Sequence, residues 1–270
     1  MDMKRINFEK IFNKTKRQRI ELTDDDRELL LFIARHKFID DVAGRIVLSK
    51  KNDRAFLRRI NKLKQYNYVR TQAATLQNIR FGIKQKNITI IALDTEGCLL
   101  TNTKKISKLA VNLKHNLYIK RICAALLKLR EQGFEYEMET IMEYDEKNKY
   151  IHIPDSKERY NIRPDIFVKD YQIAFEIELN IKDKYDYEKR LFWSQFLENL
   201  NKILWLVGTE NDKRKLINIF KNCAGIWFQI DKYGTKKLID DNVIDKNFVM
   251  TMDDFLSNYE QTILRITGLS

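Results

Sequence analysis

The sequence predicts an α+β or α/β chain with two units: a basic helical unit with a small sheet, then a mixed sheet covered by helices. Two observations predict this order. Helical spacing of apolar residues gives way to short β-rich runs before residue 94, and strands alternate with helices after residue 115. Residues 1–110 contain 25 Lys and Arg against 12 Asp and Glu, whereas the remainder contains 25 against 26. We therefore expect an arm (1–22), a basic unit (23–106) and an α/β unit (107–270).

The composition excludes several classes of protein. With 44% hydrophobic and 33% charged residues, and only 8 Gly and 2 Pro, the chain reads as globular. Its apolar runs, such as Ile203 to Val207, are too short to span a bilayer, so we expect a cytoplasmic protein without a membrane partner. The three cysteines and three histidines are scattered, which argues against a zinc site and against disulfides.

The basic unit is expected to begin with an arm and three helices. Residues 1–22 are polar and basic, typical either of an arm that follows the phosphate backbone or of a solvated leader helix. Thr23 is an expected N-cap, followed by acids in the first turn and by apolar residues at helical spacing. A second helix is expected at 40–48 and a third at 52–65.

Three short β-rich runs follow the third helix, at 68–73, 79–84 and 88–93. Three helices followed by a small antiparallel sheet is the winged-helix order, in which the third helix enters the major groove of DNA. A solvated face of a structural helix is the alternative for its cations. The residues expected to contact double-stranded DNA are Lys50, Lys51, Arg54, Arg58, Arg59 and Lys62.

The second unit is expected to be a mixed sheet with helices on both faces. Its helices are expected at 115–131, 183–201, 212–221 and 252–266. Its strands are expected at 136–144, 150–154, 166–168, 172–179, 203–207 and 224–230.

Residues 172–180 alternate between apolar and polar positions, so Glu176 and Glu178 should project from the same face of one strand, with Cβ atoms about 7 Å apart. Two carboxylates beside a buried face are costly unless cations or a metal pair with them. Asp165 precedes the neighbouring strand and is expected to lie across from Glu176. Three converging carboxylates suit Mg²⁺ or Mn²⁺, which could activate water against a phosphodiester. A solvent-facing edge strand with two harmless glutamates is the alternative.

These residues also resemble a known family. Pro164-Asp165, Glu176-x-Glu178 and Lys182, in this order of elements, look like the PD-(D/E)XK nuclease fold, also called restriction-endonuclease-like. With the preceding winged helix, His115 and the Tyr-rich helix start, the chain is similar to replication-relaxation proteins and MOBC-type conjugative relaxases. The resemblance spans roughly residues 23–230. It implies binding to an origin of transfer or replication, with metal-dependent nicking of one strand.

The chain departs from the nuclease pattern at one position, since Glu178 stands where that pattern has a lysine. The positive charge is then expected from Lys182 or Lys184, each of which is equally well an ordinary surface lysine. His115 is a further accessory candidate, although a lone histidine is more often structural. Tyr185 and Tyr187 are conceivable nucleophiles, with aromatic packing as their alternative role.

Two functions from different classes follow. The first is a relaxase, a metal-dependent DNA endonuclease of plasmid mobilisation and conjugation, in which Asp165, Glu176 and Glu178 hold the metal and Lys182 assists. The second is a non-catalytic replication or mobilisation factor that keeps a degenerate nuclease fold for docking to other relaxosome proteins. A transcriptional regulator with a ligand-binding second unit is a weaker third reading. The sequence leaves the oligomeric state open.

Overall fold

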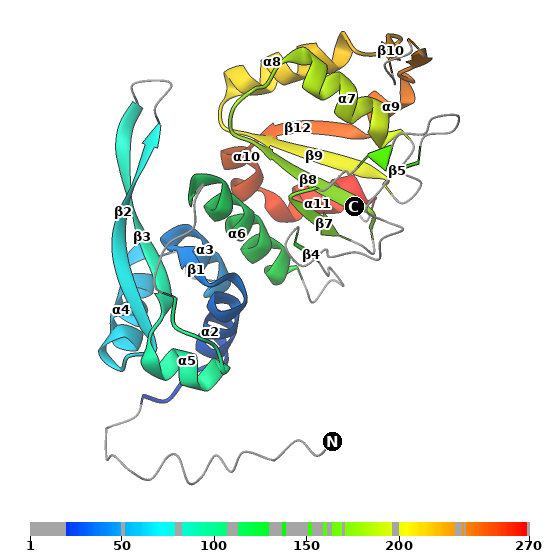
Figure 1. Ribbon diagram of the computed structural model, residues 1–270. Helices are drawn as coiled ribbons and strands as arrows, with labels where there is room; N and C mark the ends of the chain where they lie inside the picture. The colour runs from blue at the N-terminus through cyan, green and yellow to red at the C-terminus, as the bar shows by residue number, and fades with distance from the viewer. Residues whose placement is uncertain are drawn as a thin grey trace, which may run out of the picture.

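A computed structural model of the protein shows an α+β chain, which confirms the predicted fold class (Figure 1). The structure describes residues 20–49, 52–78, 83–106, 113–129, 137–138, 151–152, 159–160, 164–168, 171–195, 200–229, 234 and 236–268. The predicted arm therefore lies almost entirely outside the described residues. None of the helices described is long and apolar enough to cross a membrane.

The described residues of the basic unit form four helices and a three-stranded antiparallel sheet with the order β1-β3-β2. Its elements are α2 (Asp24–His36), β1 (Phe38–Asp40), α3 (Asp41–Val47), α4 (Asp53–Gln65), β2 (Val69–Asn78), β3 (Ile83–Leu93) and α5 (Thr95–Thr101). Short polar side chains cap these helices, and the predicted cap at Thr23 is confirmed. Thr23 caps α2 in a capping box with Asp26, and Asn52 caps α4.

The small sheet differs from the prediction in two ways. The predicted runs at 68–73 and 88–93 lie in two longer strands, β2 and β3, whose pairing continues into the polar residues that follow the first run and precede the second. The third strand, β1, was missed, since three residues before a helix carry no visible period. Residues 79–82 lie outside the described part of the chain.

The second unit is built on a five-stranded mixed sheet with the order β12-β9-β8-β7-β4. Its strands are β4 (Glu137–Met138), β7 (Ile166–Val168), β8 (Ile173–Glu178), β9 (Lys202–Val207) and β12 (Asn247–Thr251). The strands β8, β9 and β12 run parallel, whereas β7 is antiparallel to β8 and β4 is antiparallel to β7. This mixed sheet confirms the expected architecture of the unit.

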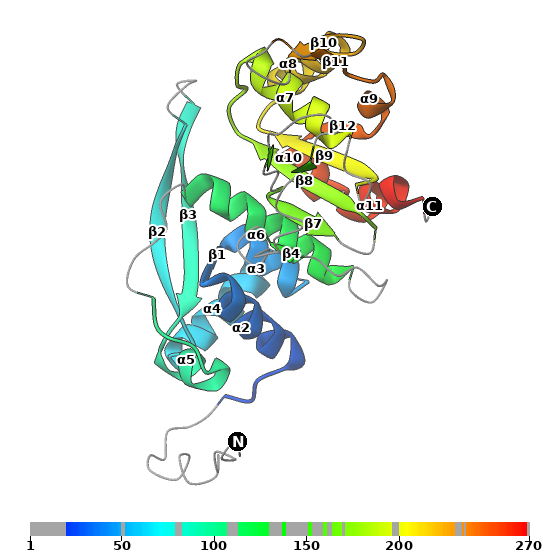
Figure 2. The same cartoon turned by 45° about the vertical axis from the view of Figure 1, so that its right-hand side comes forward.

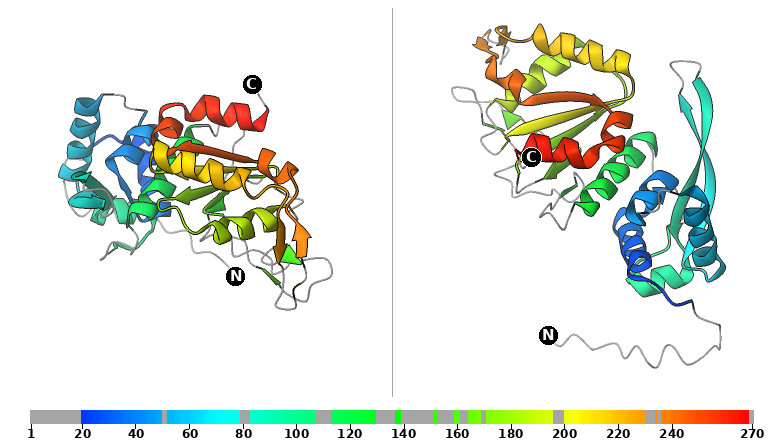
Figure 3. Two further views of the ribbon diagram at one scale, coloured as in Figure 1. Left: turned by 90° about the horizontal axis from the view of Figure 1, so that it is seen from above. Right: turned by 180° about the vertical axis from the view of Figure 1, so that it is seen from behind.

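Helices cover both faces of this sheet (Figure 3). Side chains of α6 (Leu113–Lys128), α10 (Met252–Ser257) and α11 (Tyr259–Thr267) share one core with Phe175 and Ile177 of β8. Side chains of α7 (Lys184–Ser194) and α8 (Glu210–Lys221) share a second core with Ala174 and Trp205. The strand β8 is therefore buried from both sides, although alternation of apolar and polar residues is typical of a strand with only one buried face.

The far end of the second unit corrects two predictions. The predicted core strand at 224–230 is only β10 (Trp227–Gln229), which pairs with β11 (Lys236–Leu238) in a separate hairpin that exposes Trp227. The fifth strand of the main sheet is instead β12, after the short helix α9 (Asn242–Asp245). The predicted closing helix is divided at Asn258 into α10 and α11. A second small hairpin joins β5 (Ile151–His152) to β6 (Arg159–Tyr160).

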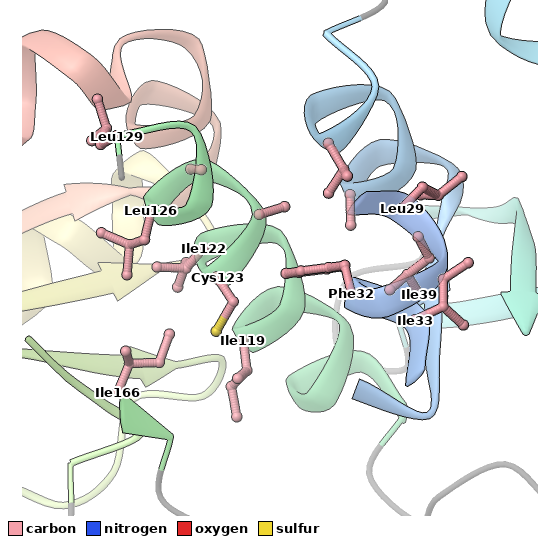
Figure 4. Close-up of a cluster of buried hydrophobic side chains, with 14 of the residues drawn as sticks. Leu29, Phe32, Ile33, Ile39, Ile119, Ile122, Cys123, Leu126, Leu129 and Ile166 are labelled. Atoms are coloured by element: carbon pink, nitrogen blue, oxygen red, sulfur yellow. The ribbon is translucent and has the colours of Figure 1, made fainter. Parts of the chain in front are cut away.

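The two units share one hydrophobic core, and α6 is the element that joins them (Figure 2). Phe32 of α2 approaches α6 from the basic unit, while Ile122 and Leu126 of α6 lie toward Ile166 of β7 (Figure 4). A buried ion pair accompanies this contact, since Arg121 of α6 donates to Asp40, which also caps α3. Apolar packing and this pair together fix the basic unit against the sheet.

Candidate functional site

The strand β8 directs two carboxylates toward α7. Ile173, Phe175 and Ile177 pack with α6, so the alternate residues Glu176 and Glu178 face the other way, beside Ala174. Both glutamates make side-chain contacts in this direction, Glu176 with a residue of α7 and Glu178 with the turn before it. The prediction that the two acids share one face of the strand is confirmed.

Asp165 adds a third carboxylate from the neighbouring strand. Ile166 pairs with Phe175 in the antiparallel register of β7 and β8, so Asp165, one residue earlier, lies at the level of Glu176. Its Oδ2 accepts a hydrogen bond of 2.7 Å from the backbone N–H of Ile177. The predicted position of Asp165 across from Glu176 is confirmed, and the main chain of β8 holds its carboxylate in place.

Each of the three acids lies beside a different basic side chain. His115 Nε2 of α6 is 3.2 Å from Asp165 Oδ2, and Arg190 Nη1 of α7 donates to Glu176 Oε2 at 2.9 Å. Lys182 Nζ is 3.2 Å from Glu178 Oε2. We call these six residues the carboxylate cluster. The basic partners come from α6, from α7 and from the turn before α7, and this pairing makes the partial burial of the acids tolerable.

Proximity and burial change the ionisation of the cluster. The pKa of Glu176 is raised to about 8. Burial is the largest cause and the nearby Asp165 and Glu178 add to it, whereas Arg190 acts in the opposite direction. Burial opposes the charge of Arg190, yet Glu176 and Glu178 keep its pKa above the ordinary value. Near neutral pH, Glu176 therefore keeps a proton more readily than an ordinary glutamate does.

The residues of the cluster fit a divalent cation only in part. Among the described residues, no three His, Cys, Asp or Glu side chains form a group that could hold a metal ion. Mg²⁺, however, commonly takes one or two carboxylates from the protein and its other ligands from water and phosphate. Asp165 and Glu176, at the same level of adjacent strands, fit that smaller role. A metal site at Asp165, Glu176 and Glu178 stays a prediction.

The other predicted accessory residues lie around the start of α7. Lys184 pairs with Glu188 of its own helix at 3.1 Å, and Tyr185 is 60% exposed and stacks on Phe228. The buried Tyr187 packs against Trp205, and its hydroxyl oxygen accepts from the backbone N–H of Lys182 at 3.0 Å. Burial raises the pKa of Tyr187, and Glu178 raises it further, so a phenolate nucleophile is disfavoured there.

Arg190 is the residue of the cluster that sequence reasoning missed. It follows Tyr187 by three positions, so the two side chains lie on the same side of α7. That spacing was the available signal: a cation on the helix stripe that faces a strand with two carboxylates. The Lys-rich sequence around it, in which Lys184 and Lys189 are also present, concealed which cation turns inward.

The helix α4 separates the predicted DNA contacts into two groups. The side chains of Arg54, Arg58 and Lys62 are exposed and form no ion pair with any residue in the described ranges. Arg59 instead turns inward, where its guanidinium donates to the fully buried Asp26 of α2. Lys50 and Lys51 lie outside the described residues.

Comparison with known proteins leaves the site to be interpreted from its own geometry. No protein-family model, no curated protein and no solved structure matches this chain.

Proposed function

We propose that the protein binds double-stranded DNA through a winged helix and nicks one strand in its second unit with a divalent metal. The element order α2-β1-α3-α4-β2-β3 supports the first half, because helices, a long hairpin and an exposed basic helix occur in winged-helix DNA readers. The sequence resemblance extends this proposal to a relaxase acting at a plasmid or mobile-element origin, together with other relaxosome proteins.

The observation that carries the second half is the carboxylate cluster. Acids brought together from adjacent strands and surrounded by fixed cations suit phosphodiester chemistry, where charge develops on phosphate oxygens in the transition state. Asp165 and Glu176 would hold Mg²⁺ or Mn²⁺, with Glu178 beside them. The metal would supply an activated water and neutralise phosphate charge.

The cations of the chain have their own roles in this proposal. Arg190 and Lys182 take over the positive charge that the nuclease pattern assigns to the lysine replaced by Glu178. A guanidinium suits this role because it remains charged and can contact two phosphate oxygens at once. His115, beside Asp165, is placed to move a proton.

The paired state of the acids also supports a second function. Because each acid already has a basic partner, the cluster would be stable in a protein that never cuts DNA. In that case the chain is a replication or mobilisation factor whose second unit docks onto partners. The absence of a group of three metal-binding side chains among the described residues favours this alternative.

A nicking assay separates the two functions. Supercoiled plasmid carrying the origin of the element should relax to open circles with Mg²⁺ or Mn²⁺ and the full chain. Asp165→Asn and Glu176→Gln should lower the rate at least about 100-fold while duplex affinity remains unchanged. Asp186→Asn, which changes an exposed acid of α7, is the matched control and should nick normally. Tight origin binding with no nicking under either metal would establish the non-catalytic alternative.

A further inference from the structure

The outward face of α4 carries two uncharged side chains among its cations. Leu57 is 50% exposed, and Asn61 lies one turn further along the helix. Residues 54, 57, 58 and 61 follow the spacing of one helix face, so Leu57 and Asn61 lie beside Arg54 and Arg58, and Lys62 follows Arg58 by one turn. An apolar group and an amide beside a row of cations are suited to a ligand that is anionic at its edge.

Contacts with the rest of the unit keep this face turned outward. Phe56, Ile60 and Leu63 bury the opposite side of α4 in the core. Asp53, the acid at the start of the helix, is paired with Arg45 of α3, and Arg59 is paired with Asp26. These pairs leave three cations with no acid opposing them on the outward face among the described residues.

We infer that Leu57 and Asn61 read the bases of the DNA site, and that this site contains A·T pairs where they touch it. This inference rests on the proposed DNA-binding function. In the major groove, only thymine presents a methyl group, which suits Leu57. The amide of Asn61 can donate to adenine N7 and accept from adenine N6. Arg54, Arg58 and Lys62 contact the flanking phosphates and set the position of the helix.

The base-reading role follows from position as well as chemistry. A recognition helix contacts base edges with residues near its N-terminus, and Leu57 is the fifth of the 13 residues of α4. Asn61 follows Leu57 by one turn on the same side of the helix. A protein partner for the same face would need an acidic surface. Duplex DNA supplies negative charge on both sides of a groove that also displays an apolar methyl group, so it matches all five side chains.

Replacement of thymine by uracil tests the contact of Leu57, because uracil lacks only the methyl group. The duplex site is first selected from a random pool with the full chain, and affinities are measured by fluorescence anisotropy. Uracil at one position of the site should weaken binding about fourfold for the wild type. Leu57→Ala should bind the thymine duplex with a similar loss and should no longer respond to uracil. Leu31→Ala, which shortens an exposed leucine of α2, should respond like the wild type.

Asn61→Ala tests the adenine contact independently. Its affinity for the selected duplex should fall about tenfold, and a repeated selection should lose one adenine that the wild type requires. A wild type that selects a site but ignores every uracil substitution, or a Leu57→Ala variant that still responds to uracil, would overturn the inference alone. A wild type with no preference for any duplex would contradict the proposed DNA-reading function itself.

Discussion

Arg190 provides a positive charge beside the acids of the carboxylate cluster, so its removal should lower the stability of the folded protein. Arg190→Ala leaves Glu176 without its 2.9 Å partner, while Asp165 and Glu178 remain nearby. We expect the free energy of unfolding at pH 7 to fall by about 1–3 kcal/mol, measured by urea denaturation. Arg214→Ala, which removes an exposed arginine of α8, is the control and should change stability little. Equal stability of the two variants would mean that the pair contributes nothing to folding.

The raised pKa of Glu176 predicts a pH dependence of stability. The folded protein keeps this proton up to about pH 8, whereas the unfolded chain loses it near the ordinary pKa of 4.5. Unfolding therefore releases a proton in this window, so the contribution of Glu176 to stability falls as pH rises from about 4.5 to about 8. The loss is at most about 1.4 kcal/mol per pH unit.

Glu176→Gln isolates this contribution because it replaces the titrating group with a neutral side chain of similar size. The difference in free energy of unfolding between wild type and variant should change with pH between about 4.5 and about 8 and be constant below that window. Urea melts at five pH values would measure it. A constant difference across the whole range would show that burial does not raise this pKa.

At the scale of the element, α4 separates a structural face from an exposed basic face, which the proposed function assigns to DNA. Arg54→Ala combined with Arg58→Ala should weaken DNA binding and reduce the slope of log affinity against log salt by about 2, since two phosphate contacts are lost. The fold should be unaffected, because both side chains are exposed. Anisotropy titrations at four salt concentrations would measure the slope, and an unchanged slope would exclude this face as the DNA contact.

Arg59→Ala should have the opposite effects: it should lower stability and leave the salt dependence of DNA binding unchanged. It leaves Asp26 buried with Thr23 as its remaining partner, so the free energy of unfolding should fall by about 3 kcal/mol, measured by thermal or urea denaturation. The salt slope of DNA binding should stay close to that of the wild type. A large loss of slope with full stability would return Arg59 to the group of DNA contacts.

At the scale of the whole molecule, α6 joins the two units through one hydrophobic core, so we expect them to unfold together. One core cluster runs from Leu29 of α2 through Ile122 to Phe175 and Phe255. The helix α6 also carries His115 to the carboxylate cluster and Arg121 to Asp40. The orientation of α4 relative to the carboxylate cluster is therefore fixed by packing, and in the proposed function it sets the distance from the bound site to the nick.

Arg121→Met tests this coupling. The substitution removes the ion-pair partner of the buried Asp40 carboxylate, so the free energy of unfolding should fall by about 3–5 kcal/mol. All three tryptophans lie in the second unit, so their fluorescence follows that unit, while far-UV circular dichroism follows both units. The two signals should shift together in the variant. A tryptophan transition that stays in place while the circular dichroism signal shifts would mean that the units unfold independently.

Local chemistry, visible in the sequence, determined much of this protein. The Thr23 cap, the outward cations of α4 and the same-face placement of Glu176 and Glu178 follow from short-range patterns. Helix period, strand alternation and capping depend on neighbours a few residues away, so one sequence is enough to predict them. The position of Asp165 opposite Glu176 followed from pairing of adjacent strands.

Only the tertiary structure decided which side chains meet across long separations. The sequence gives no sign that Arg59 turns to Asp26 rather than to solvent. The spacing of Arg190 makes it one candidate among several cations of α7, and only the structure shows that it reaches Glu176. It also could not rank 224–230 against 247–251 as the fifth strand, since both runs are short and apolar and only sheet packing separates them. These choices depend on which apolar faces are buried together, a free energy summed over the whole chain.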